Sequence, residues 1–235
     1  MNLAIVYCVH GNEPYGLEVV KKLPGIPSFI GNEHALKQHK RFIDTDLNRS
    51  FPGDPLGNHE EKLAHTLRSQ LTTFEYVLDL HSSSNECPLF GIITSPSKKK
   101  ISFAKRLGLQ RLIIMTTSVA SGKALIDHVD CGISLEIGPH TREENIDEVV
   151  THIRRLASSE HFDIPLEIYE VFKIIKKERC NILIKNFERV HKGQLIAKDH
   201  LGEQYAESDF IAILVNESAY KDILCFAAKL TISYE

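Results

Sequence analysis

The feature that most constrains this chain is an apolar run that ends abruptly in polar residues. Residues 3–9 read LAIVYCV and pass directly into His10-Gly11-Asn12-Glu13-Pro14. A nearly continuous apolar run of this length is typical of a strand covered on both faces, as in the parallel sheets of α/β proteins. The run is too short to cross a bilayer and lacks the features of a secretory signal. We therefore interpret residues 3–9 as a buried strand.

Strand and helix patterns alternate through the first two thirds of the sequence. Leucines 63, 67 and 71 recur at helical spacing, and Pro14 suits the first turn of a helix. Alternation of this kind predicts a mostly parallel sheet with helices on both sides. Further predicted strands cover 76–81, 89–94, 111–115 and 132–137, and predicted helices cover 59–71, 100–107 and 143–158.

The pattern of predicted secondary structure changes after Pro165. Short β-leaning segments, separated by turn signals such as Lys192-Gly193, replace the alternation. We therefore predict two domains, an α/β domain over residues 1–161 and a small β-rich C-terminal domain over residues 162–235. The predicted strands of the second domain are 166–176, 181–185, 194–198 and 210–215.

Composition excludes several classes of partner. The chain is 43% apolar and 25% charged, with 28 basic and 31 acidic residues well mixed along it. No basic stripe indicates nucleic acid binding, and no polybasic segment indicates an anionic membrane, so we expect a small-molecule partner. The five cysteines are scattered and form no C-x-x-C pair, which favours free thiols in a reducing cytoplasm.

His10 and Glu13 are candidate metal ligands. They stand three residues apart at the end of the first strand, and catalytic zinc sites commonly use two histidines and a glutamate. His81 is the best-placed second histidine, because it ends the predicted strand 76–81 and α/β sheets present functional residues at the carboxyl ends of strands. Asp79 is expected to orient a ligand histidine. The alternatives are an ordinary surface His–Glu pair and a structural zinc, but structural sites are usually closed and rich in cysteine.

Glu136 is a candidate general base. It lies within the apolar stretch 133–137, and burying a carboxylate there is costly unless it is paired or takes part in chemistry. In a zinc mechanism it would activate a zinc-bound water and return the proton to the leaving nitrogen. The alternative is a strand-end glutamate that faces solvent or pairs with an arginine.

Residues 41–58 form a predicted loop of 18 residues that carries two arginines. Loops of that length are usually functional or disordered, and we expect this one to be anchored by its apolar side chains. Arg41 and Arg49 are suited to gripping a carboxylate and to stabilising an oxyanion, although loop arginines are often merely solvated. The expected anchors are Phe42, Ile43, Leu47 and Phe51.

Taken together, four motifs in order resemble the aspartoacylase and succinylglutamate desuccinylase family, which belongs with the zinc carboxypeptidases. The resemblance implies a zinc carboxypeptidase-like α/β/α sandwich with a mostly parallel mixed sheet, and a β-rich C-terminal domain that narrows the active-site entrance. The motifs are His10 to Gly16, Arg41 to Gly53, Asp79-Leu80-His81 and Leu135 to Pro139, with a weaker echo at Val215 to Tyr220.

The resemblance also implies a reaction and a set of roles. The implied reaction is hydrolysis of an N-acyl amino acid to a carboxylate and a free amino acid. One Zn²⁺ per chain is implied on His10, Glu13 and His81, with Glu136 as the general base, Arg41 polarising the scissile carbonyl, Asn48 and Arg49 gripping a substrate carboxylate, and Tyr220 closing over the substrate.

The sequence departs from aspartoacylases in one respect. Those enzymes use a further arginine upstream of the base, but residues 112–135 contain no arginine, and Lys123 and His128 are the only basic candidates there. Acceptance of N-acetylaspartate, the acyl group, the amino acid, the metal loaded in the cell and assembly into a homo-oligomer are left open. Two alternatives also stay open: a carboxypeptidase acting on short peptides, and a catalytically silent metal-binding relative.

Overall fold

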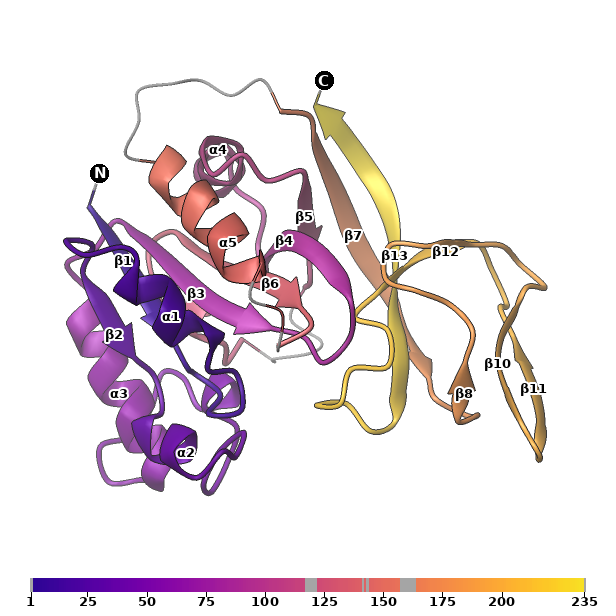
Figure 1. Cartoon of the computed structure of the whole chain (residues 1–235), viewed down its shortest axis with the longest axis horizontal. Helices are drawn as coiled ribbons and strands as arrows, with labels where there is room; N and C mark the ends of the chain where they lie inside the picture. The colour runs from indigo at the N-terminus through magenta and orange to yellow at the C-terminus, as the bar shows by residue number, and fades with distance from the viewer. Residues whose placement is uncertain (1, 117–121, 141, 143, 157–163, 235) are drawn as a thin grey trace.

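A large mixed sheet runs through the molecule (Figure 1). The computed structural model describes residues 2–116, 122–140, 142, 144–156 and 164–234. The ten strands of this sheet lie in the order β2-β1-β3-β6-β4-β5-β7-β13-β12-β9. Their bounds are β1 Leu3–Tyr7, β2 Ser28–Ile30, β3 Tyr76–Ser82, β4 Cys87–Ile93, β5 Arg111–Ile114, β6 Gly132–Gly138, β7 Leu166–Lys176, β9 Arg189–Val190, β12 Phe210–Ile213 and β13 Ile223–Tyr234.

The first part of the sheet is mostly parallel, as the strand–helix alternation predicts. Strands β2, β1, β3 and β6 run parallel to one another, and β4, β5 and β7 form a second parallel set. The two sets meet where β4 pairs with β6 in antiparallel orientation. The sheet therefore brings the carboxyl ends of β1, β3 and β6 to one edge.

Helices cover both faces of the sheet. In β1 the side chains alternate, so that Leu3 and Ile5 face one core with α1, α4 and α5 while Ala4 and Val6 face the other core with α3. This arrangement confirms the predicted α/β/α sandwich. The helices are α1 Tyr15–Lys21, α2 Glu33–Lys37, α3 His59–Leu71, α4 Lys98–Arg106 and α5 Glu144–Arg155, with 3-10 turns η1 Leu47–Arg49 and η2 Leu125–Asp127.

The C-terminal region is built from strands. The long strands β7 and β13 pair in antiparallel orientation, and a separate three-stranded sheet contains β8 Asn181–Ile182, β10 Leu195–Asp199 and β11 Gly202–Tyr205. Because β7 also pairs with β5, the main sheet continues from the α/β region into the C-terminal region. The predicted boundary between residues 161 and 162 falls in 157–163, outside the described residues, so the division into two domains stays a prediction.

The loop 41–58 is ordered by partners on both sides. Leu47 and Phe51 are buried as predicted, but Phe42 is 38% exposed, so its predicted role as an anchor is wrong. A buried carboxylate anchors the loop in place of Phe42. Glu60 of α3 accepts hydrogen bonds from the backbone N–H groups of residues 43, 44 and 45, which satisfies donors that an irregular loop leaves unpaired.

All five cysteines are free, and four of them are buried, as predicted for thiols that form no disulfides. Among the described helices, none is long and apolar enough to span a membrane.

Candidate active site

The predicted ligands and the predicted base lie together at the carboxyl ends of three neighbouring strands. His10 follows β1, His81 lies near the end of β3, and Glu136 lies near the end of β6. In the parallel pairing of β3 with β6, His81 stands directly opposite Glu136. The sequence positions them together because each strand ends at the same edge of the sheet.

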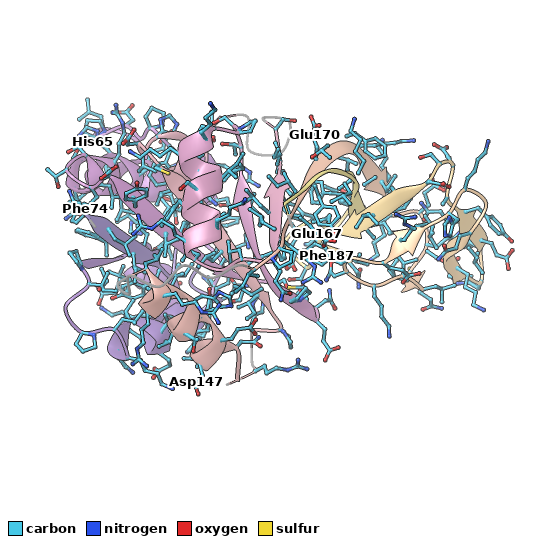
Figure 2. All side chains as sticks on the ribbon, turned by 90° about the horizontal axis from the view of Figure 1, so that it is seen from above. His65, Phe74, Asp147, Glu167, Glu170 and Phe187 are labelled. Atoms are coloured by element: carbon cyan, nitrogen blue, oxygen red, sulfur yellow. The ribbon has the colours of Figure 1, made fainter. Side chains whose placement is uncertain are left out.

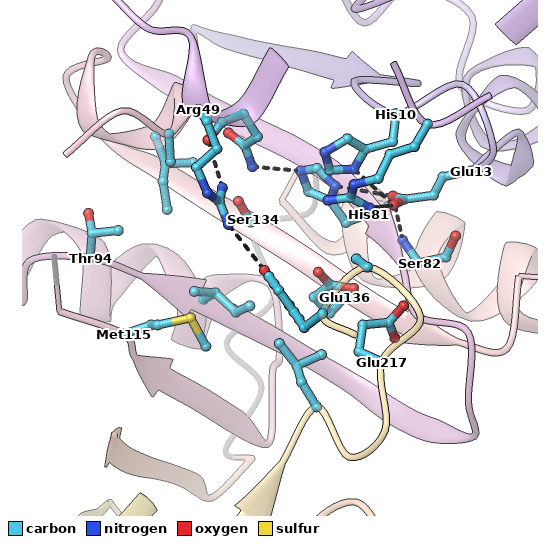
Figure 3. Close-up of a pocket in the computed structure, with 18 residues that line it drawn as sticks. His10, Glu13, Arg49, His81, Ser82, Thr94, Met115, Ser134, Glu136 and Glu217 are labelled. Carbon is cyan, nitrogen blue, oxygen red and sulfur yellow. Dashed lines mark hydrogen bonds and ion pairs between the residues drawn. The ribbon is translucent and has the colours of Figure 1, made fainter. Parts of the chain in front are cut away.

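His10, Glu13 and His81 form a compact cluster of potential metal ligands. Their ligand atoms lie within 4.8 Å of one another, and each residue is 3% exposed. The Glu13 carboxylate lies beside both rings, 2.8 Å from Nδ1 of His10 and 3.1 Å from Nδ1 of His81 (Figure 3). The backbone N–H of Ser82 donates to the same carboxylate over 3.1 Å, which fixes its position.

An aspartate holds the other nitrogen of each histidine. Nε2 of His10 lies 3.0 Å from Oδ1 of Asp46, and Nε2 of His81 lies 2.7 Å from Oδ2 of Asp79. Aspartates in this position fix the orientation of ligand histidines and increase their basicity. The sequence pattern indicated Asp79 but missed Asp46, whose only signal was its place two residues before Asn48 in the loop motif.

This cluster fits a zinc ion by its chemistry and by its charge. Two imidazoles and a glutamate are an established ligand set for catalytic zinc. Burial alone would raise the pKa of Glu13, but His10 and His81 hold that pKa well below its usual range. Likewise, burial would lower the pKa of His81, but Asp79 and Glu13 raise that pKa well above its usual value. Buried carboxylates that favour positive charge on the imidazole of His81 also favour a cation bound in this cluster.

Glu136 faces the pocket beside this cluster. Figure 3 shows it between His81 and Glu217, and it is partly exposed to the pocket. Burial, reinforced by the charges of Glu13 and Glu217, raises the pKa of Glu136 to about 8, although His81 and Arg41 oppose the shift. A carboxyl group with such a pKa binds and releases a proton near neutral pH, which is the property that a general base needs.

The loop contributes three polar side chains to the same pocket. Arg41 donates to Asp46 over 3.1 Å and to Glu13 over 3.2 Å, and therefore lies beside the ligand cluster. The side chain of Asn48 is oriented by the backbone N–H of Leu125, which donates to its Oδ1 over 2.8 Å. The guanidinium of Arg49 donates to the backbone oxygen of Asn48 over 2.7 Å.

The segment between β12 and β13 closes one side of the pocket. Tyr220 lies in this segment, and its hydroxyl accepts a hydrogen bond from Arg49. Glu217 lies three residues earlier and accepts two hydrogen bonds of 2.8 Å from the backbone N–H and the hydroxyl of Ser84, which follows β3. Glu217 was part of the weak C-terminal motif but was not predicted as a pocket residue.

All eight predicted site residues line one hollow of about 700 Å³, a volume that includes space open to solvent. The structure thus brings the predicted residues together, and their individual roles stay predictions. The eight residues are His10, Glu13, Arg41, Asn48, Arg49, His81, Glu136 and Tyr220.

The fold and the motifs define a family. Residues 1–158 match the Succinylglutamate desuccinylase/Aspartoacylase catalytic domain, and the chain belongs to this family. The resemblance predicted from the four motifs is therefore confirmed.

Particular relatives extend the comparison. A probable aspartoacylase of Acaryochloris marina is 32% identical over 161 residues, which cover 58% of this chain and 55% of that protein. The chain thus spans about half the length of this relative. The N-acyl-aromatic-L-amino acid amidohydrolase (carboxylate-forming) of Rattus norvegicus is 25% identical, over 94% of this chain and 79% of that protein. The crystal structure of murine aminoacylase 3 has the same fold, with a TM-score of 0.81, 21% identity and coverage of 99% of this chain and 96% of that one.

Proposed function

We propose that this protein is a zinc-dependent hydrolase that cleaves the amide bond of an N-acyl amino acid and releases a carboxylate and a free amino acid. The observation that carries the proposal is the buried cluster of His10, Glu13 and His81 with Glu136 beside it. Membership of the Succinylglutamate desuccinylase/Aspartoacylase family supports the substrate class.

Zinc held by His10, Glu13 and His81 supplies Lewis acidity, which lowers the pKa of water and polarises a carbonyl group. The protein's own groups then handle the protons. Glu136 accepts a proton from the attacking water as the new C–O bond forms, and donates that proton to the nitrogen as the C–N bond breaks. Its raised pKa matches this double duty, because the carboxyl group is able to hold the proton between the two steps.

The two arginines would serve different ends of the substrate. Arg41 lies within 3.2 Å of Glu13 and so stands where charge develops on the carbonyl oxygen during attack. Arg49 has no carboxylate partner among the described ion pairs, which leaves its guanidinium available for the carboxylate of the amino acid. Asn48 would support this grip from the adjacent position.

One observation favours a deacylase over a carboxypeptidase that acts on peptides. The segment that follows β12 reaches the pocket with Leu214, Glu217 and Tyr220 and walls off one side of it. A site enclosed in this way suits a compact substrate better than an extended chain. The presence of Glu136 in turn argues against a silent metal-binding relative, because metal binding alone needs no base.

The test compares the zinc-loaded wild-type protein with Glu136→Gln on a panel of N-acyl amino acids and short peptides. We expect the wild type to release free amino acid, and the variant to keep its zinc while losing at least about 100-fold in turnover. Glu203→Gln, on an exposed position of β11, is the matched control and should behave as the wild type. Equal turnover in Glu136→Gln would remove the proposed base, and cleavage of peptides alone would establish the carboxypeptidase.

A further inference from the structure

The pocket contains few lysine and arginine side chains. Among the described residues that line it, Arg41 and Arg49 are the only lysines or arginines. Arg41 is already paired with Asp46 and Glu13. The residues outside the described part of the chain include no lysine or arginine in the sequence, so they add no such charge. The site therefore offers one guanidinium, that of Arg49, without a carboxylate partner among the described ion pairs.

The two other basic candidates of this region do not line the pocket. Lys123 is exposed to solvent, and its backbone oxygen accepts a hydrogen bond from the N–H of Phe51. The ring of His128 stacks on Phe51 with 6.2 Å between centroids, and its Nε2 lies 2.9 Å from the backbone oxygen of Gly122. Neither residue lines the pocket, so neither replaces the arginine that aspartoacylases carry upstream of the base.

The wall of the pocket away from the ligand cluster is mostly apolar, and the hydroxyl of Thr94 on this side donates to Asp127. Ile92 of β4, Met115 after β5 and Leu214 after β12 line it, and their exposed fractions are 8%, 7% and 5%. Figure 3 shows Met115 on the side away from His10 and Glu13. Side chains of this kind favour an uncharged group, because they give an ionised group no hydrogen bond or opposite charge.

The acidic residues of the pocket reinforce this selection. Glu136 and Glu217 both line it, and Glu217 is held there by its two hydrogen bonds from Ser84. A second carboxylate on the substrate would approach Glu217 in a site of low dielectric, where repulsion between like charges is strong, and Glu136 would add to this repulsion when it is ionised. The pocket thus has a partner for one carboxylate and an unfavourable environment for another.

We propose that the substrate carries a single carboxylate, that of the amino acid itself, and that its acyl group and its side chain are both uncharged and predominantly apolar. This inference rests on the proposed function of the same site. It predicts N-acetyl derivatives of neutral amino acids as substrates, and excludes N-acyl derivatives of aspartate and glutamate and N-succinyl amino acids.

The first test measures kcat/KM of the zinc-loaded wild-type protein for three compounds. N-acetyl-L-leucine is expected to exceed both N-acetyl-L-aspartate and N-succinyl-L-leucine by at least about 100-fold, the order of discrimination that an unpaired charge imposes on a binding site. Equal values, or a preference for either dicarboxylate, would overturn the proposal.

A binding measurement separates this proposal from the proposed function. Titration calorimetry of zinc-loaded Glu136→Gln with N-acetyl-L-leucine and with N-acetyl-L-aspartate reports recognition without turnover. Tighter binding of the leucine compound supports a single-carboxylate site even if the wild type hydrolyses neither compound, in which case the deacylase function alone fails. Tighter or equal binding of the aspartate compound contradicts the inference about substrate class.

A charge introduced into the apolar wall should reverse the selection. Met115→Arg is expected to raise the ratio of kcat/KM for N-acetyl-L-aspartate over N-acetyl-L-leucine by at least about 10-fold, since it supplies the missing guanidinium. Met115→Leu keeps the wall apolar and is the matched control, with the wild-type order of preference. An unchanged ratio in folded Met115→Arg would count against the assignment of this wall, and the wild-type comparisons decide the proposal if that variant fails to fold.

Discussion

Arg49 donates a hydrogen bond over 3.2 Å to the hydroxyl of Tyr220, although 171 residues separate the two along the chain. The contact joins the loop of the α/β region to the segment that precedes β13. Because Arg49 is the proposed grip on the substrate carboxylate, this hydrogen bond links the C-terminal region to substrate binding.

Removal of this hydrogen bond should weaken substrate binding more than it slows chemistry. We expect Tyr220→Phe to raise KM by about 10-fold, the cost of losing a hydrogen bond to a charged group, with little change in kcat. Steady-state kinetics on the best substrate measures both values. Tyr205→Phe, at an exposed position of β11, is the control, and a normal KM in Tyr220→Phe would show that Tyr220 does not support Arg49.

The two arginines should give opposite kinetic signatures. Arg49→Ala is expected to raise KM with a smaller effect on kcat, because it removes a grip used before and during the reaction. Arg41→Ala is expected to lower kcat, because Arg41 stands where charge appears only in the transition state. A wild-type KM in Arg49→Ala would show that Arg49 does not bind the substrate carboxylate and that another residue does.

Asp46 should affect metal affinity although it is not a proposed ligand. Burial alone would raise the pKa of Asp46, but His10 and Arg41 hold that pKa well below its usual range, so the group stays ionised beside His10. We expect Asp46→Asn to weaken zinc binding by about 10–100-fold, measured by competition with a chelator. Asp130→Asn, on a residue that pairs with Lys99 at the surface, is the control. Unaltered affinity in Asp46→Asn would mean that the hydrogen bond to His10 does not tune the site.

Glu136 should lower the stability of the metal-free protein at neutral pH. Its pKa is raised from an ordinary value near 4.5 to about 8. Between these pH values the carboxyl group is therefore ionised in the unfolded chain and protonated in the folded protein. The stabilising contribution of the protonated group is therefore complete below pH 4.5 and is lost as the pH rises towards 8. Each pKa unit corresponds to about 1.4 kcal/mol, so Glu136→Gln should unfold several degrees above the wild type at pH 8.

Measuring the difference in Tm at two pH values separates the titration of Glu136 from a change in packing. The difference in Tm between Glu136→Gln and the wild type should shrink as the pH falls to 5, because the wild-type carboxyl group is then protonated in the folded state. The exposed Glu203→Gln should show no such trend. A constant difference at both pH values would indicate a packing effect in place of the titration of Glu136.

The sequence predicted the main elements because each leaves a strong local signal. Apolar strands that carry His10, His81 and Glu136 at or beside their ends imply a common edge, and the parallel orientation of β1, β3 and β6 follows from the alternation of strands and helices. The pairing of β3 with β6 was not predicted. The loop anchors Leu47 and Phe51 were predicted for the same reason, since each is apolar in a polar segment.

Other features depend on contacts that no local pattern reveals. The bond from Asp46 to His10 requires knowledge of how the loop folds back, and the exposure of Phe42 reflects that Glu60 fixes the loop backbone there. The long strand β13 was not predicted, and its position in the sheet is defined by pairing with β7, which lies far from it in the sequence. Site residues at strand ends were predicted from the sequence, whereas contacts between segments distant in the sequence were not.

Under the proposed function, hydrolysis requires zinc on His10, Glu13 and His81. The most direct measurement titrates zinc into chelator-stripped protein while following the release of L-leucine from N-acetyl-L-leucine, alongside zinc content by metal analysis. We expect activity to rise from near zero to a plateau at one zinc per chain, and His81→Ala to retain neither zinc nor activity. Full activity in the stripped protein, or full zinc content in His81→Ala, would contradict the account.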